Sequence, residues 1–134
     1  MKSTVEDDKN IIKSIIQDLC QTETDIPKKH MDESFIFIRP SGNPLNLKTW
    51  DDMMNASDVI VKSNNLVSIE RLQVVNNMAY VCYVSHGIFS YKGVENDDIA
   101  VLVSILEKKN GTWKVVYGQR STGRKPSETL PQFN

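Results

Sequence analysis

The first hydrophobic pattern in the chain has the spacing of a helix. Four apolar residues recur at intervals of three and four positions: Ile12, Ile15, Ile16 and Leu19. Residues at these intervals share one helical face, so the pattern predicts an amphipathic helix that ends near Thr22. Ser3 and Glu6 match a capping box with Ser3 as the cap, which places the start of this helix directly after Ser3.

Two shorter helices are expected next. Pro27 suits a first helical turn because its φ is already helical, and residues 27–30 would form this helix with Thr24 and Asp25 as caps. Further along, four residues share one helical face: Trp50, Met53, Met54 and Ser57. Asn46 precedes them and is a suitable cap for a third, short helix.

A strand is predicted between these helices. Residues 34–39 are rich in Phe and Ile, which is typical of a strand that is covered on both faces or ends against a helix. Residues 40–44 end it as a turn, because Pro40 and Pro44 lack an N–H donor and Gly42 can adopt a positive φ.

From residue 66 onward the hydrophobic period changes to two, which is the period of a strand. Four segments carry this pattern: residues 66–75, 78–91, 99–109 and 113–120. The connections between them are Asn76-Asn77, Lys92-Gly93 with an acidic loop at 95–98, and Asn110-Gly111. Asn-Gly favours a type I′ turn, which needs positive φ at both central residues. The last two strands are therefore expected to pair antiparallel.

The order of these elements predicts an α+β protein. Helices grouped before an antiparallel sheet must cover one of its faces, and the space between them becomes either core or pocket. A chain of 134 residues fits one hydrophobic core. We expect a domain over residues 1–122 and a tail with little structure over residues 123–134, where Pro126 and Pro131 stand among polar residues.

Composition excludes several classes of partner. Sixteen basic and seventeen acidic residues give a net charge of −1 without blocks of like charge, which argues against nucleic acid. The longest apolar stretch, residues 78–84, is far short of the ~20 residues of a membrane helix. The N-terminus has no apolar signal core, and Cys20 and Cys82 form no disulfide or metal motif. We expect a cytoplasmic protein with no membrane contact and reduced cysteines.

Residues 110–121, Asn-Gly-Thr-Trp-Lys-Val-Val-Tyr-Gly-Gln-Arg-Ser, have a pattern seen at the end of one known family. With the element order over residues 4–122, they resemble the nuclear-transport-factor-two-like (NTF2-like) superfamily, which includes SnoaL-like cyclases and ketosteroid isomerases. Residues 110–121 in particular resemble the end of the association domain of calcium/calmodulin-dependent kinase type two. The resemblance implies a cone-shaped domain whose strongly bent, antiparallel or mixed sheet wraps around three N-terminal helices. It also implies a homodimer or larger homo-oligomer through the outer sheet face, and a pocket at the wide end.

Several positions depart from the members of this superfamily. The kinase association domains have histidines where this chain has Tyr117 and Gln119, and an arginine where it has Ser85. Of the polar positions of the kinase association domains, this chain matches only the one at Arg120. A carbonic-anhydrase class carries His-His-Ser-Ser where residues 118–121 are Gly-Gln-Arg-Ser, so that activity is not supported.

His86 is the candidate catalytic residue. Its imidazole could exchange a proton near neutral pH, with Tyr83 or Tyr91 as a hydrogen-bond donor. The alternative is an inert histidine at the edge of a dimer interface. Tyr83 and His86 lie an odd number of residues apart, so only a β-bulge could bring both to one cavity. His30, His86 and the two cysteines lack metal-ligand spacing, so no metal and no cofactor are expected.

Two arginines are the candidate ligand-binding cations. Arg39 and Arg120 end predicted strands, where a guanidinium could hold a carboxylate through two parallel hydrogen bonds. The alternative is a salt bridge to Asp32, Glu33 or Asp97. The apolar lining of the same pocket would come from four residues: Trp50, Met54, Tyr83 and Tyr91.

Three functions stay open. The first is a module that binds a small organic acid in an apolar pocket gated by arginine. The second is an isomerase, cyclase or hydratase with His86 as general base. The third is an assembly or interaction module, which would be favoured if side chains fill the cone.

Overall fold

A computed structural model describes residues 4–128. In chain order the elements are α1 Val5–Leu19, α2 Asp25–Lys28, β1 Met31–Ile38, β2 Pro44–Asn46, α3 Leu47–Met54, β3 Val59–Val75, β4 Met78–Tyr91, β5 Val94–Lys109 and β6 Thr112–Arg120. The strands form one mixed sheet in the order β2-β1-β6-β5-β4-β3. β1 and β6 run parallel, whereas the other neighbouring pairs are antiparallel. The α+β class and the mixed sheet are as expected.

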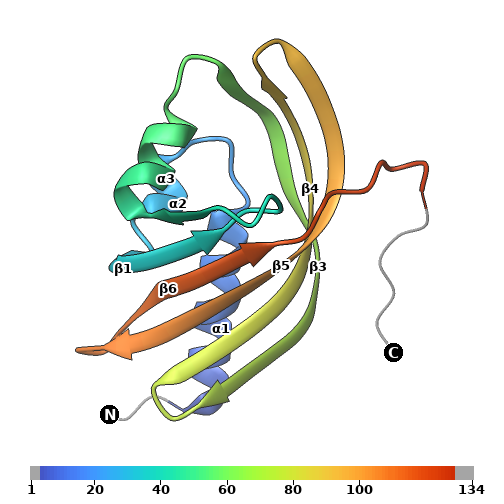
Figure 1. Ribbon diagram of the computed structural model, residues 1–134. Coiled ribbons are helices and arrows are strands. Elements are labelled where there is room, and N and C mark those ends of the chain that lie inside the picture. The colour runs from blue at the N-terminus through green and yellow to red at the C-terminus, as the bar shows by residue number, and fades with distance from the viewer. Residues whose placement is uncertain (1–3, 129–134) are drawn as a thin grey trace.

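The sheet bends strongly, and the helices lie within the bend (Figure 1). β3 carries an extra residue at each of three places along its pairing with β4, after Val61, Leu66 and Ile69. Such bulges bend a strand and increase its twist. The bend produces the cone expected from the resemblance, with α1 along the concave face and α2 and α3 together at one end of the sheet.

Helix α1 begins one residue later than the sequence pattern predicted. Ser3 lies outside the described residues, and the capping box is formed by Thr4 and Asp7, whose backbone N–H donates to Thr4 Oγ1 at 3.0 Å. The helix ends at Leu19 rather than near Thr22, with Cys20 as its cap. None of the helices in residues 4–128 is long and apolar enough to cross a membrane.

A buried carboxylate joins α1 to the end of the sheet. Asp8 is 7 % exposed and accepts a hydrogen bond from Trp113 Nε1 at 3.0 Å. Lys108 Nζ also donates to Asp8 Oδ1, at 3.2 Å. A buried charge is tolerated when it is paired and hydrogen-bonded, so these contacts fix the helix against the β5–β6 hairpin.

The short helices and the strand that the sequence predicted are present, but their first and last residues differ from the predicted ones. The helix expected at 27–30 is α2, Asp25–Lys28, and the strand expected at 34–39 is β1, Met31–Ile38. Asn46 caps α3 as predicted, and accepts from the Thr49 backbone N–H at 2.9 Å. The pattern did not predict β2, a three-residue edge strand paired with β1, because two of its positions are polar or proline.

The strands also extend beyond their predicted ends. β3 begins at Val59 rather than at residue 66, since its bulges interrupt the two-residue alternation that would have revealed it. The acidic loop expected at 95–98 belongs to β5 and pairs with β4. Asn110 and Gly111 have φ of 52° and 78°, as a type I′ turn requires, and join the antiparallel pair β5 and β6.

The chain stays paired after β6 ends. The Ser121 N–H donates to the Val101 carbonyl at 2.9 Å. Ile99 and Arg124 exchange two backbone hydrogen bonds of 2.7 and 2.8 Å. Residues 121–124 therefore continue along β5, past the boundary that composition placed at residue 122.

Candidate functional site

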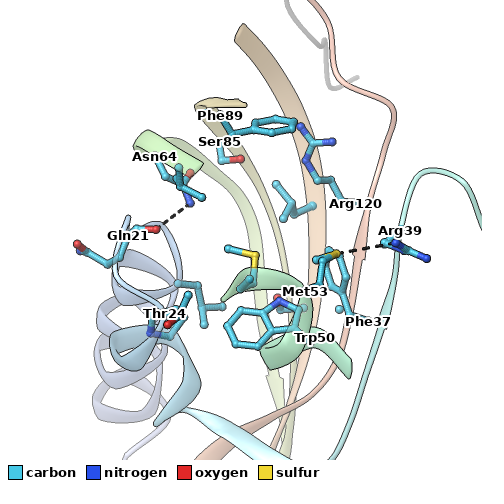
Figure 2. Close-up of a pocket in the computed structure, with 18 of the residues that line it drawn as sticks. Gln21, Thr24, Phe37, Arg39, Trp50, Met53, Asn64, Ser85, Phe89 and Arg120 are labelled. Carbon is cyan, nitrogen blue, oxygen red and sulfur yellow. Dashed lines mark hydrogen bonds between the residues drawn. The ribbon is translucent and has the colours of Figure 1, made fainter. Parts of the chain in front are cut away.

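The concave face of the sheet and the helices enclose a cavity of about 450 Å³ (Figure 2). This volume lies within the usual range for small-molecule sites. All six residues expected around a pocket line it: Arg39, Trp50, Met54, Tyr83, Tyr91 and Arg120. Among the lining residues that the structure describes, three are charged: Glu23, Arg39 and Arg120.

One wall of the cavity is lined by aromatic rings and by methionine side chains. Trp50 on α3 is buried, and its ring meets Phe35 of β1 edge-on at a centroid distance of 6.4 Å. Met53 and Met54 continue this wall along α3. Rigid rings beside adaptable methionine side chains suit an apolar ligand body of irregular shape.

Tyr83 lines the cavity from β4. Its side chain is 3 % exposed, and its hydroxyl lies 3.0 Å from Ser104 Oγ on β5. Burial raises the pKa of Tyr83 above its usual value, so the phenol stays protonated over the whole ordinary pH range. Tyr91 ends the same strand at the rim, where its side chain is half-exposed.

Arg120 brings a positive charge to the cavity from the end of β6. Its closest carboxylate among the described residues is Asp98, whose Oδ2 lies 4.0 Å from Arg120 Nη2. The guanidinium carbon of Arg120 lies over the Phe89 ring, 5.9 Å from its centroid. Within residues 4–128 its guanidinium donates no hydrogen bond. Burial lowers its pKa, while the charge of Asp98 acts in the opposite direction. The side chain thus carries a partly desolvated charge with unused donors.

Arg39 lies where β1 ends and a turn begins. Its guanidinium donates to Met53 Sδ at 3.8 Å (Figure 2). Its Nε donates to the Asn43 carbonyl at 3.4 Å. Among the described residues no carboxylate pairs with it. Two of the alternative partners that the sequence suggested are engaged elsewhere, since Asp32 contacts Lys109 and Asp97 contacts His86.

His86 lies on the other face of the sheet. β4 pairs with β5 without a register shift, so Tyr83 and His86 point to opposite faces, and His86 is not among the residues that line the cavity. Its Nε2 contacts the carboxylate of Asp97 on β5. A general base must reach the substrate, so this geometry gives His86 no role as the base of a reaction in this cavity.

Further residues line the cavity that the sequence did not predict as site residues. Phe89 and Ser85 share the inner face of β4 with Tyr83 and Tyr91, a two-residue spacing that could have revealed them. Asn64 gives no such signal because it lies in the bulged part of β3. Its side-chain amide donates to the Gln21 carbonyl at 3.5 Å (Figure 2). The described residues contain no cluster of metal-ligating side chains.

The cone, its sheet order and its internal cavity define an NTF2-like fold. An NTF2-like protein of unknown function from Prochlorococcus marinus is similar, with 32 % identity, a TM-score of 0.81 and coverage of 93 % of this chain and 96 % of that chain. The chain belongs to the family of proteins of unknown function DUF3804, whose model matches residues 7–129.

More distant structures share the fold alone. A ketosteroid isomerase-like protein from Erwinia carotovora atroseptica has 13 % identity, a TM-score of 0.70 and coverage of 88 % of this chain and 94 % of that chain. The association domain of CaMKII from C. elegans has 17 % identity, a TM-score of 0.62 and coverage of 87 % and 94 %. No curated protein matches this sequence. One fold therefore carries isomerase-like and association-domain members, and function must be argued from the site.

Proposed function

We propose that the protein binds a small organic acid in the cavity of the cone. The apolar body of the ligand packs against Trp50, Phe35 and the methionines of α3, while its acidic group accepts hydrogen bonds from Arg120. A lining of aromatic side chains with few converging polar groups is the usual composition of such sites.

The observation that carries this proposal is the state of Arg120. Its guanidinium is partly desolvated, lines the cavity, and donates no hydrogen bond within residues 4–128. A guanidinium offers five donors in a planar fork, and a carboxylate can accept two of them in parallel. A bound acid would supply the acceptors that Asp98, at 4.0 Å, does not.

Binding is favoured over the enzyme alternative by the cavity's ionisable groups. Glu23 is the one carboxylate that lines the cavity in the described part of the chain, and no histidine of that part lines it. An isomerase, cyclase or hydratase needs a positioned acid or base beside the substrate, which His86 does not supply.

A thermal-shift series tests the proposal. Aliphatic and aromatic monocarboxylates are compared with their neutral amides on the wild type, Arg120→Gln and Lys13→Gln. Lys13 is exposed on α1 and gives the same charge change away from the cavity. At ligand concentrations 100-fold above Kd we expect the wild type and Lys13→Gln to gain about 8 °C with an acid, and Arg120→Gln to gain far less. Equal shifts with acids and amides, or an unaffected Arg120→Gln, would contradict the proposal.

We also propose that the protein forms a homodimer or larger homo-oligomer through the outer face of the sheet. An apolar patch there combines cross-strand neighbours from β4, β5 and β6: Tyr80, Cys82, Val103, Ile105 and Tyr117. Tyr80 is 41 % and Val103 36 % exposed, which is unusual for large apolar side chains grouped on a sheet. The fold's association-domain members favour a second copy of the chain as the covering partner.

A further inference from the structure

The two arginines of the cavity come from neighbouring backbone positions on strands far apart in sequence. β1 and β6 pair in parallel, with Phe37 opposite Gly118 and Ile38 opposite Gln119. Arg39, the first residue after β1, and Arg120, the last residue of β6, follow these paired positions directly. Neighbouring strands lie about 4.8 Å apart, so the two side chains leave the backbone side by side.

Both side chains also leave the sheet on its inner face. Phe37 and Gly118 face the cavity, and Arg39 and Arg120 follow them by two residues, which returns each side chain to the same face. Both arginines accordingly line the cavity.

The two guanidinium groups then separate. Arg120 lies over the ring of Phe89, whereas Arg39 reaches Met53 on α3 (Figure 2). The turn after β1 holds the backbone of Arg39 in place, since its N–H donates to the Asn43 carbonyl at 3.3 Å and its carbonyl accepts from Gly42 at 2.8 Å. The cavity therefore presents two separate cationic groups rather than one shared pair.

The charge of the lining residues is not balanced. Glu23 is the one described carboxylate among them, against Arg39 and Arg120. Asp98 offsets part of the charge of Arg120, but no described carboxylate offsets Arg39. Like charges beside an apolar wall repel each other more strongly than in water, and an anion at each guanidinium removes that cost.

Building on the proposed function, we propose that the ligand carries two acidic groups: one bound by Arg120 inside the cone and the second by Arg39 at its mouth. The apolar linker between them packs against the aromatic and thioether wall. The chemical class is a short α,ω-dicarboxylate. Arg39 is thus the residue that distinguishes diacids from monoacids.

Calorimetric titration with dicarboxylates from succinate to suberate, each beside its monomethyl ester, tests this inference. A charge-assisted hydrogen bond contributes enough for at least about a tenfold change in Kd. We expect the best diacid to bind the wild type at least tenfold more tightly than its ester. Arg39→Gln should weaken diacid binding far more than ester binding and so remove this advantage. Arg120→Gln should weaken both ligands, and Lys13→Gln neither.

The outcomes separate the two proposals. If each diacid binds no better than its ester while both depend on Arg120, the ligand is a monoacid, so this inference fails and the proposed function stands. If Arg39→Gln weakens the binding of the diacid and of its ester equally, Arg39 does not bind a second acidic group, and the inference fails as well. If no acid binds, both proposals fail.

Discussion

Gly118 and Phe37 lie against each other across the parallel β1–β6 pair. A Cβ on residue 118 would stand 3.1 Å from Cδ2 of Phe37, which is closer than side chains normally pack. The glycine therefore makes room for an aromatic ring that faces the cavity.

Gly118→Ala is expected to destabilise the protein by about 1–3 kcal/mol, because the added Cβ displaces the Phe37 ring from its place against residue 118. Urea denaturation measures the change. Gly87→Ala is the matched control, since a Cβ there would meet its neighbours at ordinary distances of 3.8 and 3.9 Å. Equal losses in the two variants would show that the Phe37 contact is not the cause.

The buried thiol of Cys20 predicts a loss of stability at high pH. Burial raises its pKa from a usual value of 9.0 to about 11, so the folded protein keeps a proton that the unfolded chain releases. The stabilisation is complete below pH 9 and is lost as the pH rises towards 11, by about 2–3 kcal/mol. Unfolding free energies of the wild type and Cys20→Ala should converge over this interval. Parallel pH profiles would contradict this.

Asp98→Asn should tighten the binding of organic acids. Its carboxylate lies 4.0 Å from Arg120 and competes with a bound anion for the same charge. Removing that charge while keeping the shape is expected to lower Kd for a monocarboxylate about threefold to tenfold, as measured by calorimetry. Weaker binding would instead make Asp98 a positioning residue for the guanidinium.

A charge in the apolar patch of the outer sheet face should dissociate the proposed oligomer. Val103→Asp places a carboxylate among Tyr80 and its neighbours, where a second copy would desolvate it. Light scattering after size exclusion should show a multimeric wild type and a monomeric variant. Ile11→Asp, on the exposed face of α1, is the control and should stay multimeric. A monomeric wild type would refute the proposal.

Local patterns predicted most of the fold. Helical periodicity found α1 and α3, and the Asn110-Gly111 turn specified the β5–β6 pair, because these signals depend on residues close in sequence. The early part of β3 was not predicted, since its bulges break the alternation of apolar and polar positions.

The site was predicted in parts. Sequence reasoning placed Arg39 and Arg120 at strand ends, and both line the cavity. It could not show that they are neighbours, because a parallel register between strands some eighty residues apart has no local signature. It paired neither arginine with Asp98, whose place on the inner face depends on a strand that was expected to be a loop.

The close approach of Gly123 to Asp98 links the end of the chain to the pocket. A Cβ at residue 123 would stand 2.6 Å from Cβ of Asp98, so the backbone after β6 lies directly on the side chain that faces Arg120. Proteolytic trimming after Arg120 would admit water to this carboxylate and weaken its hold on the guanidinium. Such trimming would change the affinity for acids without removing any residue that lines the cavity.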